Sequence, residues 1–405
     1  MRIALATVGT TGDVRPFRTL ATRLVERGHE VTAISWPVHR TALAQSGVRV
    51  EVAGPHADPA RIAAVAADAA QRSPLEQVAV LRDFHLADGE EHYRRLRELL
   101  PGNDLVLLHG IHALAQAAAM DLGVRWVTAV FDPVLLPTGS APPPGMPSLG
   151  PANRLLWRVL DRVLQRTGRP LDDLLQRAGS GQRGLPLFRA RSPLLHLVAC
   201  SPSLIQVPPD LPAATRVTGA WLDRSSPAPL PAEVEAFLAD GPPPIVLTFG
   251  SMAGSSGDEI ADALRVMLDG GRRVIVQGSG ESTSPNMLRV DTLDHRALFP
   301  RAALVIHHGG AGTTHAAVAA GIPSVVVPHV GDQRYWAARL HGLGVAPAPV
   351  DVRGLSGVRL GEAALAAAAD PRPRAAAGAL ATRLADEDGT GVAVGLLERA
   401  ASTER

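Results

Sequence analysis

The stretch RIALATVGTTGDVRPFRTLATRLVERGHEVTAIS, residues 2–35, decides the fold. It opens with an apolar run that predicts a β-strand over Arg2–Val8 and ends in the turn GTTGD. Apolar residues then recur at helical spacing over Pro16–Arg27, and Gly28 ends this helix. A second strand is predicted at Glu30–Ser35. Strand, helix and strand in this order form a βαβ unit, from which parallel sheets are built.

The same pattern continues outward from this unit into both halves of the chain. Strands are predicted at Leu105–His109 and Trp126–Phe131, and PIVLTFGSMAGS from Pro244 repeats a hydrophobic strand that ends in a turn rich in Gly and Ser. We therefore expect an α/β fold with two similar domains. The later strands are predicted at Arg273–Gln277, Ala303–His307 and Ser324–Pro328.

Segments rich in Pro and Gly punctuate the chain. Residues 133–151 are too rich in both for a regular element and long for a connection, which is typical of a functional loop. A helix follows at Asn153–Gln165, with Leu155, Val159 and Val163 on one apolar stripe. The predicted division is a first domain at 1–221, a linker at 222–243, a second domain at 244–390 and a terminal helix at 391–405.

Composition excludes several classes of function. The chain of 405 residues is 46% hydrophobic and 20% charged, which is typical of a globular protein, and its net charge of +1 gives no field to attract nucleic acid. All 40 basic residues are Arg, so the chain has no Lys. This excludes a P-loop, and it excludes enzymes that form a Schiff base through Lys, including those that bind pyridoxal phosphate. The single cysteine, Cys200, is expected in the core. With no signal peptide or membrane-spanning run, we expect a cytoplasmic protein.

The second half contains a candidate ligand site in LVIHHGGAGTTHAAVAAGIPSVVVPHVGDQRYWAA, residues 304–338. A buried strand ends in two histidines and a Gly-rich turn, and a helix begins at Thr313. Free N–H groups and the positive end of the helix dipole make such a turn an anion site. No Lys and no carboxylate pair for Mg²⁺ lie nearby, which suits a diphosphate that acts as a leaving group. Asp332 and Gln333 follow the next strand, and an acid beside an amide suits the hydroxyls of a sugar.

This motif closely resembles the donor signature of GT-B fold glycosyltransferases, specifically the family-1 antibiotic, macrolide and sterol glycosyltransferases. The amino-terminal VGTTGDVRPFRTLATRLVERGHEV also resembles the opening strand, loop and helix of that family. The resemblance implies two Rossmann-like domains that face each other across a cleft. It also implies inverting transfer of a TDP- or UDP-linked sugar to a hydroxyl of an apolar, polyketide-like acceptor, without a metal or other cofactor. The first domain would bind the acceptor and the second the donor.

The resemblance also assigns roles to single residues. Asp332 and Gln333 would hold the sugar, and the nucleobase would rest near residues 288–295, at Val290, where the Trp of many relatives is missing. The expected contacts of the diphosphate are Ser251, His307, His308, Gly310, Gly312 and Thr313.

The candidate catalytic pair lies in the first half of the chain. Many relatives carry His as the base where this chain has Asp13, and His109 stands where those relatives place the orienting Asp. We favour Asp13 as the base, although an Asp before a helix also serves as a cap. His109 is either its partner or an ordinary strand-end histidine. Asp132 is interpreted as a turn residue, and Asp386 and Asp388 as part of a helix end.

Other interpretations remain open from the sequence alone. A nucleotide-sugar epimerase can use the same fold and diphosphate site, although the Pro-rich 133–151 segment favours transfer to an acceptor. A non-catalytic partner of another glycosyltransferase is a third possibility, against which the intact Asp13, His307, Asp332 and Gln333 argue. A nicotinamide oxidoreductase is disfavoured because GTTGD lacks GxGxxG spacing.

Overall fold

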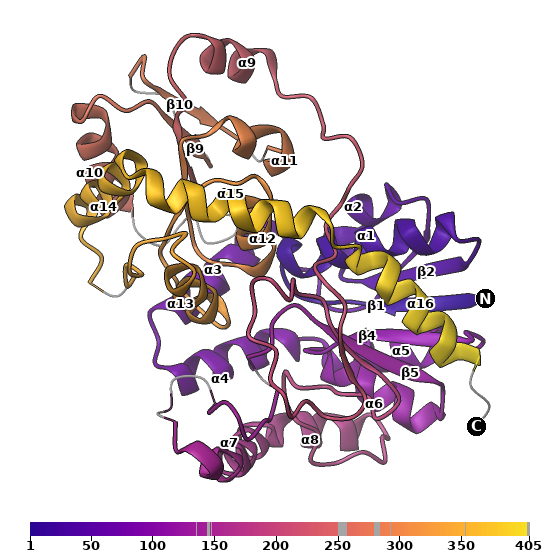
Figure 1. Cartoon of the computed structure of the whole chain (residues 1–405). Helices are drawn as coiled ribbons and strands as arrows, with labels where there is room; N and C mark the ends of the chain where they lie inside the picture. The colour runs from indigo at the N-terminus through magenta and orange to yellow at the C-terminus, as the bar shows by residue number, and fades with distance from the viewer. Residues whose placement is uncertain are drawn as a thin grey trace. The chain divides into compact units, whose positions relative to one another are not determined.

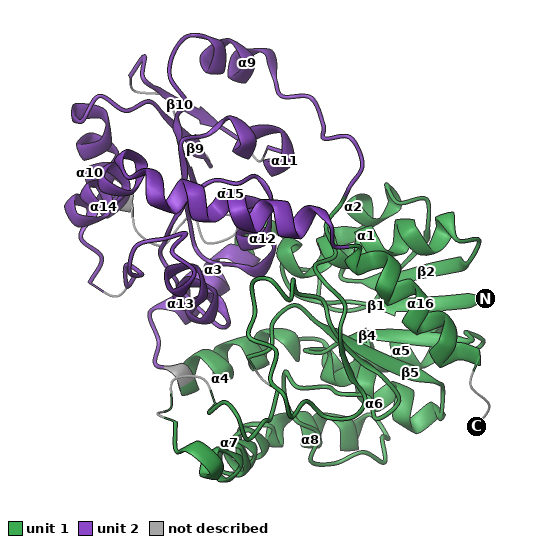
Figure 2. Ribbon diagram, viewed as in Figure 1, with its two compact units in different colours: residues 1–61, 74–223, 388–405 green, residues 62–73, 224–387 purple. Residues whose placement is uncertain are grey.

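The chain forms two compact units, shown in separate colours in Figure 2. The computed structural model describes residues 1–134, 136–143, 146, 148–249, 257–278, 284–291, 293–352 and 354–402. Unit 1 comprises Met1–Arg61, Pro74–Asp223 and Asp388–Arg405, and unit 2 comprises Ile62–Ser73 and Arg224–Glu387.

Unit 1 is built on a parallel sheet (Figure 1). Within the described residues it has seven strands in the order β3-β2-β1-β4-β5-β6-β7. Because all neighbours are parallel, the carboxyl ends of the strands share one edge. The strands are β1 (Arg2–Ala6), β2 (Glu30–Ser35), β3 (Arg49–Val52), β4 (Leu105–His109), β5 (Trp126–Val130), β6 (His196–Val198) and β7 (Thr215–Val217).

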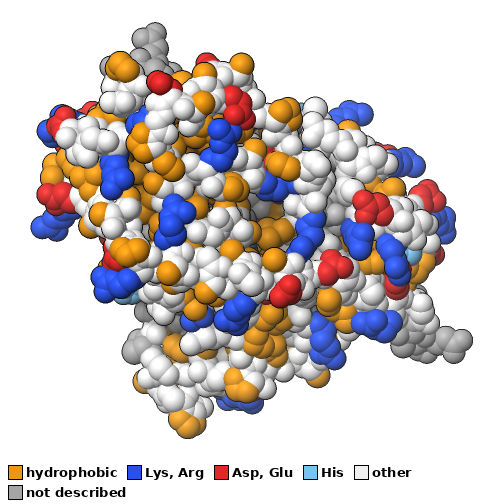
Figure 3. Space-filling view, turned by 45° about the horizontal axis from the view of Figure 1, so that its top comes forward, with side chains coloured by type: hydrophobic (Ala, Val, Ile, Leu, Met, Phe, Trp, Pro, Cys, Tyr) orange, Lys and Arg blue, Asp and Glu red, His pale blue; other side chains and the backbone are white. Residues whose placement is uncertain are grey.

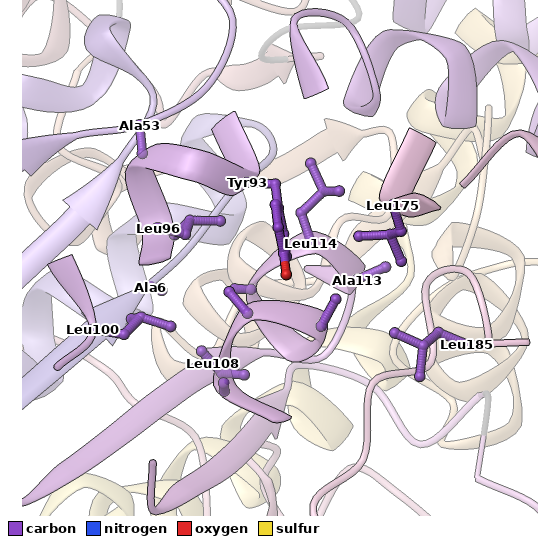
Figure 4. Close-up of a cluster of buried hydrophobic side chains, with 14 of the residues drawn as sticks. Ala6, Ala53, Tyr93, Leu96, Leu100, Leu108, Ala113, Leu114, Leu175 and Leu185 are labelled. Carbon is purple, nitrogen blue, oxygen red and sulfur yellow. The ribbon is translucent and has the colours of Figure 1, made fainter. Parts of the chain in front are cut away.

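Helices cover both faces of this sheet, as alternation along β2 shows. Ala33 packs with Val14 of α1 on one face, and its neighbour Ile34 joins the core cluster that contains Tyr93 of α5 on the other. Figure 4 shows Tyr93 and Leu114 within that cluster. The helical segments of unit 1 are α1 (Thr11–Glu26), η1 (Pro37–His39), α2 (Arg40–Ala44), α4 (Pro74–His85), α5 (Gly89–Leu99), α6 (Ala113–Leu122), η2 (Gly150–Ala152), α7 (Asn153–Thr167), α8 (Arg169–Arg177) and α16 (Gly389–Ser402).

Unit 2 repeats the architecture with a parallel sheet of five strands among its described residues, in the order β10-β9-β8-β11-β12. Val246 and Leu247 of β8 belong to different core clusters, so helices again pack on both faces. The strands are β8 (Ile245–Thr248), β9 (Val274–Gln277), β10 (Met287–Val290), β11 (Leu304–His307) and β12 (Ser324–Val326). The helical segments are α9 (Ala232–Ala239), α10 (Gly257–Asp269), α11 (His295–Leu298), η4 (Phe299–Arg301), α12 (Ala311–Ala319), α13 (Gln333–Gly342), α14 (Gly357–Ala369) and α15 (Pro371–Ala385).

The units differ from the predicted ranges 1–221 and 244–390 in three places. Unit 2 begins at Arg224, so most of the predicted linker 222–243, including α9, belongs to it. Helix α3 (Pro59–Ala70) enters unit 2 from Ile62 onward, because Ala66 and Ala70 belong to the core cluster of that unit. The chain returns to unit 1 at Asp388, and α16 contacts α1 there. Glu398 of α16 lies 3.3 Å from the Arg27 guanidinium and 3.0 Å from His29 Nε2.

Two helices differ from prediction in detail. Helix α1 begins at Thr11, five residues before the predicted Pro16, because Thr10 and Asp13 form a capping box there. Helix α7 has the predicted position, but the predicted apolar stripe is largely exposed, with Leu155 54% and Val159 42% accessible. The helix buries Trp157 instead, whose Nε1–H donates to the carbonyl of residue 141 at 2.9 Å.

The surface carries charges of both signs. On the face shown in Figure 3, basic and acidic side chains are interspersed, in keeping with the net charge of +1. Within the described residues, no helix has the length and apolarity that a membrane span requires.

Candidate active site

Asp13 lies in the first turn of α1, at the carboxyl end of β1. Its Oδ2 accepts hydrogen bonds from the backbone N–H of Thr10 at 2.7 Å and from the Thr10 hydroxyl at 2.9 Å. Gly9 has a φ of +113°, and a Cβ at this position would lie 2.4 Å from Asp13 Oδ2. Glycine is therefore required both by the backbone conformation and by the close carboxylate. The capping contacts fix the direction of the other oxygen, Oδ1.

His109 ends β4, the strand beside β1, and approaches that oxygen. Its Nδ1 lies 3.1 Å from the Val8 carbonyl, which can only accept, so Nδ1 carries the proton. Nε2 lies 4.0 Å from Asp13 Oδ1. Burial lowers the pKa of His109, although the Asp13 charge and the Val8 carbonyl oppose this. The rings of Phe17 and Phe131 lie 5.6 and 5.1 Å away. The neutral imidazole thus presents an Nε2 lone pair on the side of Asp13.

Asp132 adds a second carboxyl group to this edge of unit 1. It follows β5, and its Oδ1 accepts from the Val134 N–H at 2.8 Å, in keeping with the predicted turn. Burial raises the pKa of Asp132 to about 6, and the charge of Asp13 acts in the same direction while the Val134 hydrogen bond opposes them. Asp132 therefore keeps its proton up to a much higher pH than an ordinary carboxyl group does.

In unit 2, β11 places His307 at the start of the Gly-rich turn. The side chain is fully buried, and the Gly309 N–H donates to its Nδ1 at 3.1 Å, so the neutral ring carries its proton on Nε2. Burial lowers the pKa of His307 to about 3, with smaller effects from His308 and His295. Among the described residues, His307 Nε2 has no hydrogen-bond partner. An anionic ligand would satisfy such a donor.

Helix α12 begins directly after this turn. Gly310 is its N-cap, and Gly312 and Thr313 lie in its first turn. The Thr314 N–H donates to the Gly310 carbonyl at 2.9 Å, so the three preceding helical N–H groups have no acceptor within the helix. A Cβ at Gly310 would lie 2.5 Å from His308 Nε2, and glycine therefore lets the His308 ring lie against the turn. These groups together form the predicted cradle of N–H donors.

Asp332 and Gln333 stand at the start of α13, next to this cradle. A Cβ at Gly309 would lie 3.0 Å from the Gln333 carbonyl, which shows how closely the two loops meet. Asp332 Oδ2 accepts from Trp336 Nε1 at 2.7 Å. Gln333 Oε1 accepts from two backbone N–H groups of its own loop, at 2.7 and 3.0 Å. Both side chains therefore shape the loop, and Gln333 retains its amide NH₂ as a donor.

The remaining predicted contacts are less defined by the structure. Val290 ends β10 and is 6% exposed within a core cluster, so its side chain has little surface for a nucleobase. Its carbonyl accepts from the Gly278 N–H at 2.9 Å. Ser251 lies outside the described residues. In the part of the chain that the structure describes, no group of three or more His, Cys, Asp or Glu side chains could hold a metal ion.

Curated relatives of the chain are glycosyltransferases. The chain is 34% identical to O-mycaminosyltylonolide 6-deoxyallosyltransferase of Streptomyces fradiae, and the match covers 100% of this chain and 98% of the relative. The chain belongs to the family-1 GT-B glycosyltransferases. It is also 34% identical to vancomycin aglycone glucosyltransferase of Amycolatopsis orientalis, over 100% of this chain and 99% of the relative. Residues 268–397 of the glycosyltransferase match the family model of the erythromycin biosynthesis protein CIII-like C-terminal domain.

Solved structures agree with this fold. The glycotransferase of kitacinnamycin matches with a TM-score of 0.74 at 21% identity and covers 98% of each chain. The glycosyltransferase VinC, in complex with dTDP, matches with a TM-score of 0.70 at 23% identity and covers 99% of each chain. The predicted fold class, with two Rossmann-like domains of the GT-B type, and the predicted enzyme class are both confirmed.

Several histidines of unit 1 of this glycosyltransferase escaped the sequence reasoning. His39 Nε2 lies 2.9 Å from the Gly9 carbonyl, and the His85 ring lies 5.2 Å from that of Trp36. The rings of His92 and His112 lie 5.0 Å apart. Single histidines carry no spacing signal, and the only hint in the sequence was that His39 and His112 shortly follow predicted strands.

Proposed function

We propose that this glycosyltransferase moves a sugar from a TDP- or UDP-linked donor to a hydroxyl group of an apolar natural-product acceptor, with inversion and without a metal ion. The names of its relatives support the substrate classes, since one transfers a 6-deoxyallosyl group to O-mycaminosyltylonolide and another glucosylates vancomycin aglycone. The dTDP in the VinC structure supports a nucleoside-diphosphate donor.

The main support for the donor site is the Nε2–H of His307, which is buried and unpaired among the described residues and lies beside the N-terminus of α12. Negative charge on the diphosphate grows as its bond to the sugar breaks, so these donors bind the transition state more tightly than the ground state. The neutral His307 donates one hydrogen bond, and the first turn of α12 supplies N–H groups and the positive end of its dipole. Charge stabilisation by these groups leaves no step that requires a divalent cation.

Other residues complete the proposed donor site. We assign Ser251, His308 and Thr313 to the diphosphate as further contacts. Asp332 accepts from sugar hydroxyls, and Gln333 donates through its amide NH₂. Because the Val290 side chain is buried, the nucleobase rests against the main chain near this residue.

Asp13 acts as the general base on the acceptor side. As the acceptor oxygen bonds to the anomeric carbon, its proton passes to Asp13 Oδ1, and the electron pair of the broken bond leaves with the diphosphate. Attack from the face opposite to the leaving group inverts the anomeric configuration. His109 is a positioning residue, because its Nε2 lone pair lies 4.0 Å from Oδ1 and can accept a hydrogen bond from the protonated carboxyl group after a small approach.

The proposed function is tested with a panel of TDP- and UDP-sugars and macrolide, glycopeptide and sterol acceptors. We expect a new glycoside whose anomeric proton, observed by NMR, shows the configuration opposite to that of the donor. Retention of configuration would contradict the inverting mechanism. An epimerised nucleotide sugar without any glycoside would show that the protein is an epimerase.

A further inference from the structure

The loop that joins β1 to α1 carries the proposed base, Asp13, at its end. Its residues Val8 and Gly9 are buried, and Gly9 has a φ of +113°. The next residue, Thr10, donates its backbone N–H and its hydroxyl to Asp13 Oδ2 at 2.7 and 2.9 Å. Val8, Gly9 and Thr10 belong to no helix or strand, so the direction of the carboxylate depends on what holds this loop.

Two buried histidines hold consecutive carbonyl groups of the loop. His109 Nδ1 lies 3.1 Å from the Val8 carbonyl, and His39 Nε2 lies 2.9 Å from the Gly9 carbonyl. His109 ends β4 and His39 follows β2, and these two strands are the neighbours of β1 in the sheet. The loop is therefore anchored by one histidine from each side of its own strand.

The ring of His39 is fixed by its own surroundings. The residue is 5% exposed and ends η1, and its backbone N–H donates to the Trp36 carbonyl at 3.0 Å. The rings of His39 and Trp36 lie nearly parallel, with their centroids 6.5 Å apart. Trp36 is itself buried against the backbone, because a Cβ at Gly54 would lie 2.3 Å from Trp36 Cδ1. The imidazole thus has little freedom to turn away from the loop.

The protonation of His39 follows from its contact with the loop. A carbonyl oxygen can only accept, so Nε2 carries the proton of the neutral ring. Burial lowers the pKa of His39, although the Gly9 hydrogen bond and the charge of Asp13 oppose this. His39 is therefore neutral at pH 7 and serves as a hydrogen-bond donor rather than as a second charge.

A single peptide group connects His39 to the base. The C=O of Gly9 and the N–H of Thr10 belong to the same planar, trans peptide group, in which they point in opposite directions. The C=O accepts from His39 Nε2, and the N–H donates to Asp13 Oδ2. Because the group is rigid, a hydrogen bond that fixes its oxygen also fixes its N–H. The bond at the oxygen polarises the group as well and strengthens the bond from the N–H to the carboxylate.

Gly9 makes this external anchor necessary. Glycine adopts a wide range of backbone conformations, so Gly9 alone does not hold its peptide group in one orientation. A movement of Gly9 would reach the base directly, since a Cβ there would lie 2.4 Å from Asp13 Oδ2. Displacing a reacting group by about 1 Å can slow an enzyme about 100-fold. His39 supplies the constraint that glycine lacks.

We propose that His39 is a second positioning residue for glycosyl transfer, and that it acts on Asp13 through the peptide group between Gly9 and Thr10. The bond from His39 keeps the Thr10 N–H on Oδ2, and Oδ1 thereby keeps its direction for the acceptor hydroxyl. His39 transfers no proton and touches no substrate atom. This inference rests on the proposed function, in which Asp13 is the base.

The test compares three replacements of His39 with a control elsewhere in unit 1. His39→Leu and His39→Phe both remove the N–H donor, and Phe also keeps an aromatic ring beside Trp36, so it replaces Leu if that variant does not fold. His39→Gln keeps a donor. The matched control is His196→Leu, because His196 is 2% exposed and its Nδ1 lies 2.7 Å from Thr128 Oγ1. His196 begins β6, at the edge of the sheet opposite to Asp13.

The assay is kcat with the donor and acceptor for which the panel of sugars and acceptors yields a glycoside, together with Tm and the affinity for TDP and UDP in calorimetry. We expect His39→Leu and His39→Phe to lower kcat about 10- to 100-fold, with nucleotide affinity within about twofold of wild type. His39→Gln should keep kcat within about threefold, because it still donates to the Gly9 carbonyl. His196→Leu should lower Tm and also keep kcat within about threefold.

A double variant separates positioning from a general loss of structure. Asp13→Asn has no base left to position, so adding His39→Leu to it should lower kcat by less than about threefold. Losses from two residues that act independently would instead multiply.

Several outcomes would overturn the inference while the proposed function stands. One is wild-type kcat in the variants that lack the donor, and another is an equal loss of kcat in His39→Gln. A multiplied loss in the double variant, or an equal loss in His196→Leu, would show that His39 has only a general structural role. Transfer to none of the acceptors from any donor contradicts the proposed function, and the inference falls with it.

Discussion

Replacing Asp132 by Asn should stabilise the protein above pH 6 but hardly at pH 4. The pKa of Asp132 is raised from an ordinary 3.8 to about 6, chiefly by burial. Between these values the folded chain holds a proton that the unfolded chain has released, so the free energy of unfolding falls as pH rises and stays low above pH 6. Two pKa units correspond to about 2–3 kcal/mol. Asn is neutral at every pH and can still accept from Val134, so the variant escapes this loss.

The assay is thermal unfolding of wild type and Asp132→Asn at pH 4, 5 and 8. For a domain of 150–250 residues each kcal/mol shifts Tm by about 2–4 °C, so we expect a gain of roughly 4–12 °C at pH 8 and little change at pH 4. Asp210→Asn is the control with the opposite sign, because hydrogen bonds from Ser140 and Gly139 lower the pKa of Asp210 to about 2. The ionised Asp210 carboxylate stabilises the folded state above pH 4. Asp210→Asn should therefore unfold at a lower Tm than the wild type at pH 8. An equal change at all three pH values, or a loss for Asp132→Asn at pH 8, would refute the reasoning.

Three further predictions concern the donor site. His307→Ala should weaken NDP-sugar binding and lower kcat about 10²–10³-fold, because its N–H meets a growing charge; a change confined to the acceptor KM, measured by steady-state kinetics, would place the donor elsewhere. Asp332→Asn should change the difference in binding free energy between NDP-sugars with different sugars by about 1.5–3 kcal/mol, while the affinity for bare NDP stays the same. If calorimetry showed that the variant loses as much affinity for bare NDP as for the NDP-sugar, the main role of Asp332 would be structural, through its hydrogen bond with Trp336. Activity should persist in excess EDTA, and loss that Mg²⁺ or Mn²⁺ restores would disprove metal-free transfer.

The strands were the part of the fold that the sequence predicted best. β2 and β4 have the predicted bounds, because each is a short apolar or β-branched run that a turn or loop bounds. Helix α1 was predicted to begin at Pro16, since the capping contacts of Thr10 depend on side-chain geometry. The exposed face of α7 was also missed, because Leu155 and Val159 satisfy the helical period as well as the buried Trp157 does.

The sequence could not predict which of the two cores a helix packs into. Helix α3 is rich in alanine, and nothing in such a pattern indicates that Ala66 and Ala70 would pack in unit 2. Long-range packing of this kind depends on the completed fold and not on local periodicity.

The candidate site was predictable as a set of positions but not as chemistry. The resemblance to the glycosyltransferase family indicated Asp13 and His109, and the structure places His109 Nε2 4.0 Å from Asp13 Oδ1. The proton on His109 Nδ1 follows from the Val8 carbonyl, which no motif reveals. The raised pKa of Asp132 and the unpaired nitrogens of His92 arise from burial, and burial of single polar residues has no local signature in a sequence.

The account depends most directly on Asp13 as the base, and a comparison of transfer rates in Asp13→Asn and His109→Gln tests it. Asn still accepts the Thr10 hydrogen bonds, and Gln can still donate to the Val8 carbonyl, so both variants preserve the local contacts. At saturating donor and acceptor, we expect Asp13→Asn to slow transfer about 10²–10⁴-fold with unchanged donor affinity, and His109→Gln to cost less. Transfer by Asp13→Asn within tenfold of wild type, or a larger loss in His109→Gln, would contradict the account.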